Sequence, residues 1–520
     1  MKNCYPVIRP IVVAATILLG QAPAYAQHQI TQFYPQNGAD NDAFGSSVAI
    51  SGPRFVVGAE DIKINNLLRA GSVYLFETSQ AVQLFQLSVS DVGAHRHLGC
   101  SVGISGDRVI AGAYGGSTAY IFDANTGQEL FKLLPSTGTP GDRYGYSVAI
   151  SGNRAIVGAY LDDDAADDGG AAYIIDVATG QEILKLAASD GDSDDDFGKA
   201  VAIHGNLAIV GAPRADSDSG TLSTGAAYVF NVTTGQQLFK LCGSSEMVGD
   251  GFGGAVAIHG NRALVGADRG EGVAFATGTA SIFDLTTGLE TFRLVPPDGQ
   301  SYDMFGYSVA LGPDKAIVGA REDRDQGQYS GSAYVFDPVT GQELPKILPS
   351  NGHFGDRFGE SIALSEGRLV AGVPLKYSVQ NFRRGSAYIF CPDGVGTKYC
   401  IATPDAYGRT VSIVACGSAS LAQSEFTLYG TGISYTTYMF FYGTGQGQIP
   451  FGNGFRCVTG HVRRLGPPRQ TVREVALRVV DMASLGITPG TWNFQCWYRD
   501  PAVPGLGFNL SDGLSVTFVP

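Results

Sequence analysis

The stretch YGYSVAISGNRAIVGA at residues 144–159 decides the fold, because versions of it recur along the chain. A first marker, an aromatic residue or leucine followed by glycine, opens each copy, at Phe44-Gly45, Leu98-Gly99, Tyr144-Gly145, Phe197-Gly198, Phe252-Gly253, Phe305-Gly306 and Phe358-Gly359. A second marker, Gly-Ala, begins 14 residues after the aromatic position in every copy, and only the seventh copy degrades it, to Gly372-Val373. Successive copies start 46 to 55 residues apart, so one part of the unit has a fixed length and another part varies in length.

A complete unit contains four short runs that alternate or concentrate apolar residues, as strands do. The runs are exemplified by Ser147–Ile150, Ala155–Val157, Ala227–Phe230 and Glu129–Leu133. In five units a Ser-Gly or His-Gly pair separates the first two strands, and in five units a Thr-Gly turn separates the last two. Four antiparallel strands in about fifty residues are typical of one β-propeller blade, and a solenoid is the alternative.

The two ends of the repeat region complement each other. The seventh unit ends at its third strand, Tyr388–Phe390, and lacks the fourth strand. The segment Ile30–Pro35 precedes the first unit and resembles the fourth strand at Leu130–Pro135. Pairing these ends would hide two sheet edges. We therefore predict an all-β protein in which residues 27–398 form a seven-bladed β-propeller, with residues 28–35 closing the last blade.

These units resemble the FG-GAP repeats of the integrin α-subunit β-propeller, in the form found in secreted bacterial proteins. The resemblance covers about residues 28–391 and rests on the repeated pattern FG…SVAISG…IVGA…AYVFD..TGQEL. Integrin repeats often carry a DxDxDG calcium loop between their first two strands. Here that place holds short turns such as Ser151–Arg154 and His204–Leu207, so the calcium sites of the family do not carry over.

The N-terminus predicts an export signal at residues 1–26. Lys2 and Arg9 precede a short apolar run, Ile11–Gly20, and Ala24–Ala26 is a small-x-small cleavage site. A membrane anchor is the alternative, but a run of about ten residues is too short to span a bilayer. We expect a secreted or cell-surface protein.

The residues after Cys400 predict a second unit, a β-sandwich-like module at residues 399–520, because short apolar runs alternate there with Gly and Pro turns. The stretches at 450–458 and 491–501 resemble a C-terminal module of large secreted bacterial proteins. Its aromatic residues could stack on a carbohydrate, although a buried core is the simpler interpretation.

The cysteines of this region predict disulfides, because no CxxC or Cys/His spacing indicates a metal site and an exported protein meets an oxidising environment. We expect at least one bridge among Cys400, Cys416, Cys457 and Cys496. The pairing to be tested is Cys400–Cys457 with Cys416–Cys496, since the sequence alone does not fix it.

Acidic residues gather in three segments that the blade order places side by side on the face with the variable loops. A calcium or cationic-ligand site is one interpretation, with candidate ligands Asp162, Asp164, Asp168, Asp192, Asp194, Asp196, Asp216 and Asp218. Solvated acidic loops are the other. Asp142 and Asp356, which stand two residues before the marker aromatics, are interpreted as turn formers.

Charge, motifs and the residues of the first strands restrict the classes of function that the sequence favours. A net charge of −13 argues against a nucleic-acid partner, and no GxSxG, HExxH or P-loop motif occurs. The first strands carry Ser, Val, Ala and Ile, which offer no acid/base set for catalysis. We expect a monomeric, non-enzymatic recognition or adhesion protein that binds an extracellular protein or glycan through its variable loops. The alternatives are a polysaccharide hydrolase or lyase, and a structural component of a surface layer.

Overall fold

The structure is a computed structural model, and it describes residues 28–520 apart from residues 36–37, 40, 79–81, 165, 167, 218–222, 245–246, 377–383, 392–395, 401, 403–409, 418, 422–425, 434–435, 452, 472–474 and 501–506. The predicted export signal at residues 1–26 lies outside this part of the chain. The described residues are all-β, and their single helical element is the 3-10 turn η1 at Tyr114–Gly116. None of their helices is long and apolar enough to cross a membrane.

Seven four-stranded antiparallel sheets make up the repeat region within the described residues, and such sheets are consistent with propeller blades. Sheet 1 consists of β2 (Phe44–Ser51), β3 (Arg54–Ala59), β4 (Ser72–Glu77) and β5 (Val82–Leu87), and sheet 2 of β6 (Val102–Ser105), β7 (Arg108–Ala113), β8 (Thr118–Asp123) and β9 (Glu129–Leu133). Sheet 3 consists of β10 (Ser147–Ser151), β11 (Arg154–Ala159), β12 (Ala171–Asp176) and β13 (Glu182–Leu186), and sheet 4 of β14 (Ala200–His204), β15 (Leu207–Ala212), β16 (Ala226–Asn231) and β17 (Gln237–Leu241). Sheet 5 consists of β18 (Ala255–His259), β19 (Arg262–Ala267), β20 (Thr279–Asp284) and β21 (Leu289–Leu294), and sheet 6 of β22 (Phe305–Leu311), β23 (Ala316–Ala320), β24 (Ser332–Phe336) and β25 (Glu343–Ile347). Sheet 7 consists of β26 (Ser361–Ser365), β27 (Arg368–Val373) and β28 (Ser386–Cys391), together with β1 (His28–Phe33) from the N-terminal side.

Sheet 3 shows why these sequences form such sheets. Its middle strands β11 and β12 are buried along almost their whole length, which explains their continuous apolar runs. The predicted Thr-Gly hairpin joins β12 to β13. There the Asp176 carboxylate accepts hydrogen bonds from the backbone N–H groups of Ala178 and Thr179, at 2.9 and 3.2 Å. Gly180 follows with φ of 71°, a left-handed conformation that glycine adopts at no steric cost.

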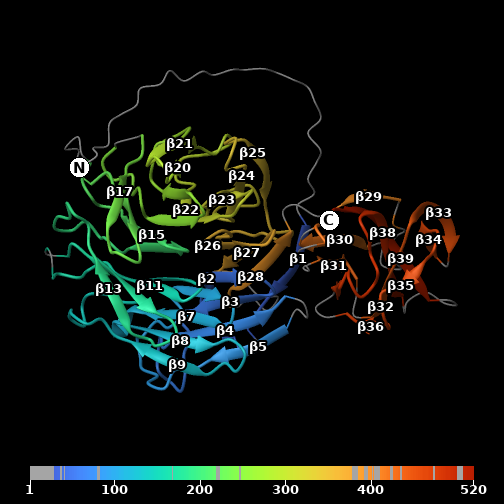
Figure 1. The fold of residues 1–520 in the computed structure, drawn as a ribbon, viewed down its shortest axis with the longest axis horizontal. Coiled ribbons are helices and arrows are strands. Elements are labelled where there is room, and N and C mark those ends of the chain that lie inside the picture. Colours follow the sequence, from blue (N-terminus) through green and yellow to red (C-terminus); the bar gives the residue numbers. More distant parts are fainter. Residues whose placement is uncertain are drawn as a thin grey trace.

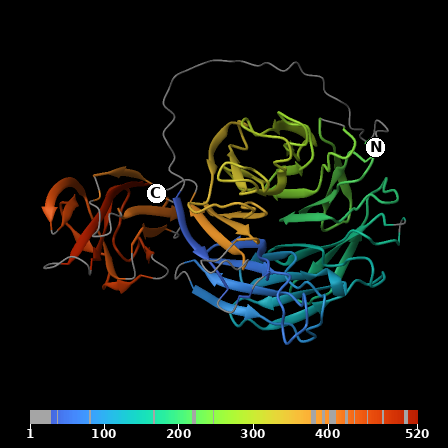
Figure 2. The same cartoon turned by 180° about the vertical axis from the view of Figure 1, so that it is seen from behind.

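The N-terminal strand completes the last sheet, as predicted. β1 pairs antiparallel with β28, and the register runs from His28 opposite Cys391 to Phe33 opposite Ala387. The first strands of the sheets also contact one another in sequence, from β2 through β6, β10, β14, β18 and β22 to β26, and β26 in turn contacts β2. Figures 1 and 2 show the seven sheets arranged around a common centre, with sheet 7 beside sheet 1.

Residues after the repeats form three further sheets. The largest contains β29 (Thr397–Tyr399), β32 (Thr437–Gly443), β35 (Arg463–Arg464), β36 (Arg469–Gln470), β38 (Gly490–Arg499) and β39 (Phe508–Phe518). The other two contain β30 (Ser412–Gly417), β31 (Phe426–Thr431) and β37 (Ala476–Val479), and the hairpin of β33 (Gly445–Phe451) and β34 (Gly454–Thr459). The three-stranded sheet and the largest sheet share one apolar core, which includes Ile413, Leu428, Phe494 and Val516.

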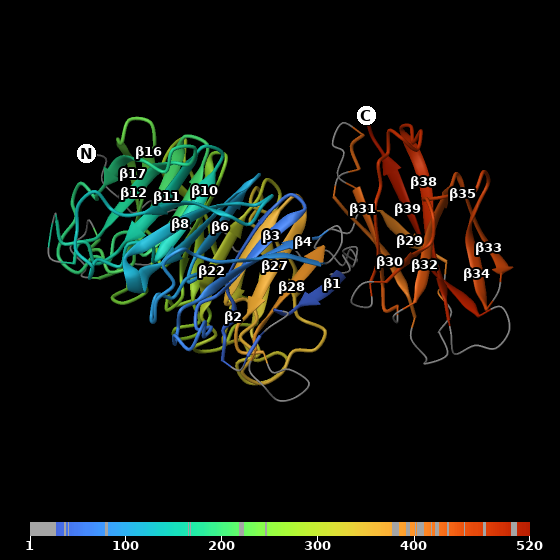
Figure 3. The ribbon, with the colours of Figure 1, turned by 90° about the horizontal axis from the view of Figure 1, so that it is seen from below.

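The three-stranded sheet is buried on both faces. Along β30, Ile413 and Ala415 enter the core shared with the largest sheet, whereas Val414 and Cys416 enter a second core that contains Phe33 of β1. This alternation is the two-residue period of a strand. The sheet therefore fixes the C-terminal strands against sheets 7 and 1, an arrangement that Figure 3 shows from the side.

The disulfides follow this packing and correct one predicted pairing. Cys400 bonds to Cys457, as predicted, but Cys416 bonds to Cys391 and not to Cys496. Cys416 points from β30 toward sheet 7, where Cys391 ends β28, whereas Cys496 is a buried free thiol in the core on the opposite face of the three-stranded sheet. The Cys391–Cys416 bond thus links the last repeat covalently to the C-terminal strands.

The marker glycines explain the constant spacing of the repeat. Within a sheet, Gly145 N donates a hydrogen bond to Gly158 O at 3.0 Å, so the 14-residue offset pairs the two markers. Between sheets, a β-carbon added to the second-marker glycine would meet the carbonyl oxygen of the first-marker glycine of the next sheet. The separations would be 1.9 Å for Gly58 and Gly99, 1.9 Å for Gly112 and Gly145, 2.1 Å for Gly158 and Gly198, 1.9 Å for Gly211 and Gly253, 2.1 Å for Gly266 and Gly306, 2.4 Å for Gly319 and Gly359, and 2.0 Å for Gly372 and Gly45.

We predict that Gly211→Ala destabilises the fold, because its new methyl group would lie 1.9 Å from the Gly253 carbonyl oxygen and would force the two sheets apart. Overpacking of this kind costs about 1–3 kcal/mol. The matched control is Gly141→Ala in an exposed connection, where the nearest atom is Thr139 Oγ1 at 3.7 Å. Thermal unfolding followed by circular dichroism should show a lower Tm for Gly211→Ala than for the control, and equal values would contradict the contact.

Candidate functional site

The loops of variable length form one surface, which we call the variable-loop face. It comprises the loop between the second and third strands of each sheet and the connection to the next sheet. Backbone hydrogen bonds join the two kinds of segment, as from Tyr302 N to Ala276 O at 3.2 Å and from Gly355 N to Gln328 O at 3.0 Å. The constant hairpins lie at the other ends of the same strands. Variation in length is thus concentrated where a rigid scaffold can present it.

Buried aspartates shape the connections between sheets. Each accepts a hydrogen bond from the backbone N–H three residues earlier: Asp142 from Thr139 at 2.7 Å, Asp195 from Asp192 at 2.9 Å, Asp303 from Gln300 at 2.6 Å, and Asp356 from His353 at 2.8 Å. All four side chains are buried. The interpretation of Asp142 and Asp356 as turn formers is confirmed.

Several acids proposed as metal ligands are held by cationic side chains. The buried Asp162 accepts hydrogen bonds from the Tyr173 hydroxyl at 2.5 Å and from Lys185 Nζ at 2.9 Å. Lys185 also donates to Asp164 at 2.5 Å. Asp196 lies 3.1 Å from Lys199 Nζ. Opposite charges in the chain itself therefore offset part of the repulsion between these carboxylates.

The remaining candidate ligands serve local structure or lie outside the described residues. Asp192 and Asp216 accept backbone hydrogen bonds, from Ser193 at 2.9 Å and from Ser223 at 2.8 Å. Asp168 and Asp194 occupy left-handed positions with φ of 52° and 66°. Asp218 lies outside the described residues. No group of three or more His, Cys, Asp or Glu residues in the described part of the chain is arranged to hold a metal ion, and a calcium site at this acidic surface stays a prediction.

A second group of polar residues, which we call the inner cluster, follows the two markers directly. It lies where the mutually contacting first strands begin. Its members are Cys100, Tyr146, Lys199, Tyr307 and Glu360 after the first marker, and Glu60, Tyr114, Tyr160, Asp268 and Arg321 after the second. The repeat pattern does not predict this cluster, because the markers record what the units share and these positions differ between units. The signal that could have found it is the change of chemistry from unit to unit at the two positions that follow the markers.

Contacts between sheets connect the inner cluster on two sides. On one side, the Tyr146 ring centroid lies 5.6 Å from that of Tyr114 and 4.6 Å from that of Tyr160, and Lys199 Nζ lies 4.1 Å from the Tyr160 centroid. On the other side, the Arg321 guanidinium stacks 3.6 Å from the Tyr307 centroid and bonds Glu360 Oε1 at 2.9 Å. These are aromatic, cation–π and charge-assisted contacts at half-buried positions.

Glu60 is the member of this group whose pKa lies near neutral pH. Burial, with a smaller contribution from the carboxylates of Asp61 and Glu360, raises the pKa of Glu60 from the usual 4.5 to about 7. His97 Nδ1 lies 3.7 Å from Glu60 Oε2, and burial lowers the pKa of His97. The inner cluster thus holds a carboxyl group suited to proton exchange near neutral pH.

Exposed aromatic side chains form a third group, the aromatic arc, on the variable-loop face of sheets 5 to 7. It comprises Phe275, Tyr302, Tyr329 and Phe354, whose exposed members Phe275, Tyr302 and Phe354 show 61%, 54% and 59% of their surface. The rings pair in sequence, Phe275 with Tyr302 at 5.6 Å and Tyr329 with Phe354 at 6.3 Å. Arg324 Nη2 bonds Ser301 O at 3.1 Å and links the loops of the two pairs.

Two members of the arc occupy backbone positions that disfavour large side chains. Tyr302 and Tyr329 have φ of 68° and 60°, in the left-handed region that costs most L-residues free energy. In five of the other six repeats the position equivalent to Tyr302 is also left-handed and holds Asn41, His95, Asp194, Gly249 or Gly355. The left-handed positions equivalent to Tyr329 hold Arg69, Asp168, Ser223 and Ala276. The exposed ring of Tyr302 and the half-buried ring of Tyr329 gain little from burial at such positions, so their presence points to a role in contact with a ligand.

We predict that Glu60→Gln stabilises the protein in a pH-dependent way. Because the folded state binds the Glu60 proton more tightly than the unfolded state, the wild-type free energy of unfolding falls as pH rises from about 4.5 to 7. Glutamine mimics the protonated form and should add about 1–3 kcal/mol at pH 8 and almost nothing at pH 4. Denaturant unfolding at both pH values measures this. The exposed Glu271→Gln is the control, and a gain for Glu60→Gln that is equal at both pH values would refute the assignment.

Comparison with known proteins agrees with the sheet pattern. The FG-GAP repeat model matches residues 28–76, 128–175, 181–230, 289–336 and 342–390. Each matched segment begins at a fourth strand and ends in the third strand of the following sheet, and the first begins with β1. No curated protein matches the chain. The chain is therefore an FG-GAP repeat protein.

Proposed function

We propose that the chain is an exported, non-enzymatic recognition or adhesion protein that binds an extracellular protein or glycan through its variable-loop face. FG-GAP repeats are typical of ligand-binding or adhesion propeller domains. Two disulfides are compatible with an oxidising extracellular location. The predicted export signal at residues 1–26 belongs to the same proposal.

The scaffold in this proposal is a seven-bladed propeller of residues 27–398 with a β-sandwich-like module at residues 399–520. The contact of β26 with β2 and the pairing of β1 with β28 support closure of the ring. The core shared by the three-stranded and largest sheets supports a sandwich-like module. Its packing against sheet 7 would hold the module in one orientation to the ring.

The aromatic arc is the observation that carries the proposed function. Exposed tyrosine and phenylalanine rings supply large contact area with little side-chain entropy to lose, which is why they dominate recognition surfaces. The backbone hydrogen bonds among its four loops hold these rings before any ligand arrives. Arg324, beside the arc, adds a donor for hydrogen bonds.

We predict that Tyr302→Asn with Tyr329→Asn abolishes ligand binding without loss of stability, because asparagine tolerates the left-handed backbone better than tyrosine does. A glycan array and an array of extracellular proteins would identify ligands of the wild-type protein, and the double variant should bind them at least tenfold more weakly. Leu289→Ser removes an equally exposed apolar side chain beside a constant hairpin and serves as the control. Equal binding by all three proteins would exclude the aromatic arc as the contact surface.

The inner cluster favours a second candidate, a polysaccharide hydrolase or lyase. Glu60, with a pKa of about 7, stands among the acids, tyrosines and cations of the inner cluster, and such groups supply general acids and bases. Incubation with a panel of polysaccharides, with release of reducing ends or unsaturated products as the readout, distinguishes the two functions. Activity that Glu60→Gln abolishes would favour the enzyme.

A calcium-dependent rise in Tm remains our expectation for the acidic loops. A divalent cation would bind the folded state selectively and stabilise it by mass action. Asp162→Ala with Asp194→Ala should reduce the rise, measured by melting in millimolar calcium and in chelator. An unchanged melting curve in calcium would identify the loops as a solvated acidic surface.

A further inference from the structure

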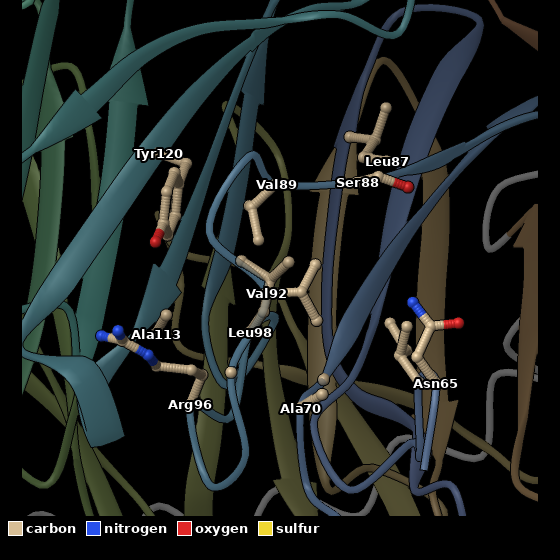
Figure 4. A pocket seen from close by; sticks show the side chains of 13 residues that line it. Asn65, Ala70, Leu87, Ser88, Val89, Val92, Arg96, Leu98, Ala113 and Tyr120 are labelled. Carbon is tan, nitrogen blue, oxygen red and sulfur yellow. The ribbon is translucent and has the colours of Figure 1, made fainter. Parts of the chain in front are cut away.

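A small, mainly apolar cavity of about 180 Å³ lies between sheets 1 and 2, on the side of the variable loops. Leu87, Val89, Val92 and Leu98 supply apolar walls, and Arg96 and Tyr120 supply polar groups. Figure 4 shows Val89, Val92 and Leu98 near the centre, with Arg96 and Tyr120 on one side. An apolar cavity of about 150 Å³ is already large enough to take benzene.

The cavity lies where one repeat departs from the others. In five of the other six sheets, the aromatic residue of the first marker packs on a tyrosine of the third strand. Their ring centroids are 5.5 Å apart for Phe44 and Tyr74, 5.2 Å for Tyr144 and Tyr173, 5.6 Å for Phe197 and Tyr228, 5.2 Å for Phe305 and Tyr334, and 5.9 Å for Phe358 and Tyr388. In sheet 2 the marker residue is Leu98, and the third-strand tyrosine, Tyr120, has no such ring opposite it.

A short loop leaves this place open. In sheet 2 only the four residues of 114–117 join the second strand β7 to the third strand β8. In sheet 3 the corresponding loop runs from the end of β11 to the start of β12, and its Asp162 covers the hydroxyl of Tyr173. Sheet 2 has no loop residue in that role, and Tyr120 instead donates to Asp91 of the preceding connection at 2.6 Å.

Arg96 supplies a positive charge at the cavity that its neighbours neutralise only weakly. Its Nη2 lies 3.8 Å from Asp91 Oδ2, and its Nη1 lies 3.5 Å from Gly116 O, both long for hydrogen bonds. Asp91 is already bound to Lys132 Nζ at 2.7 Å. The Arg96 guanidinium therefore retains donors for an anionic group.

From the missing ring and this guanidinium, we propose that the cavity beside Leu98 binds a small aromatic carboxylate. The aromatic ring of the ligand occupies the place that the marker aromatic takes in the other repeats and packs against Tyr120 and Val92. The carboxylate receives hydrogen bonds from Arg96. This site is separate from the aromatic arc and from the inner cluster, and it does not depend on the proposed recognition function.

Benzoate is the probe, and benzyl alcohol is its uncharged counterpart. For a ligand of this size we expect a Kd of about 1 mM for benzoate with the full-length protein, measured by saturation-transfer NMR and by isothermal titration. Arg96→Gln should weaken benzoate at least fivefold and change benzyl alcohol less than twofold. Equal loss for both probes, or none for either, would overturn the role of Arg96.

Leu98→Phe restores the aromatic residue of the other repeats and should fill the cavity. We expect it to raise the Tm and to weaken both probes at least tenfold. If Leu98→Phe does not fold, Val92→Phe adds a ring at another lining position of the cavity and should give the same loss. The proposal is overturned if the wild-type protein does not bind benzoate at 10 times the expected Kd, or if a folded, filled variant binds it as well as wild type does.

Discussion

The close approach of glycine backbones between neighbouring sheets is the constraint on which the rest of the structure depends. A second-marker glycine such as Gly158 leaves room for the carbonyl oxygen of Gly198 in the next sheet, and any side chain there would hold the sheets apart. The same contact occurs between sheets 7 and 1, at Gly372 and Gly45. Because hydrogen bonds inside each sheet fix the register of the two marker glycines, the number of residues between the markers cannot vary. The length of the loops outside the markers can vary.

This constraint also positions chemistry. The residues of the inner cluster directly follow the markers, so the backbone holds their Cα positions alike in every sheet while their side chains differ. Tyr146, Lys199 and Glu360 occupy equivalent places yet offer a ring, a cation and an acid. Seven equivalent positions around one centre allow a mixed polar surface to arise by single substitutions, without any change in the scaffold.

Local sequence patterns predicted the strands and their pairing well, because the spacing of the markers within each repeat is constant and reflects the strand register. The pairing of β1 with β28 and the Thr-Gly hairpins followed from such patterns. The bond between Cys391 and Cys416 did not, because it depends on which face of β30 packs against sheet 7, and both faces are apolar.

The candidate sites were harder to predict for a similar reason. The sequence shows the charge of Asp162 but not that Lys185 meets it, and it shows Tyr302 but not that its ring is exposed on a left-handed backbone. Partner and exposure are properties of tertiary packing, which single-sequence patterns do not record. The turn-forming role of Asp142 was predictable because its partner, Thr139, lies only three residues away.

The pairing of β1 with β28 has a consequence for biogenesis. The first strand of the described chain finds its partner only in the last repeat, so a growing polypeptide cannot finish sheet 7 until Cys391 has been made. Until then β1 stays an unpaired edge, and any product that stops early keeps it so. Chains interrupted during synthesis would therefore expose a strand with unpaired backbone N–H and C=O groups, which proteases and chaperones can recognise. In complete chains this strand is paired with β28.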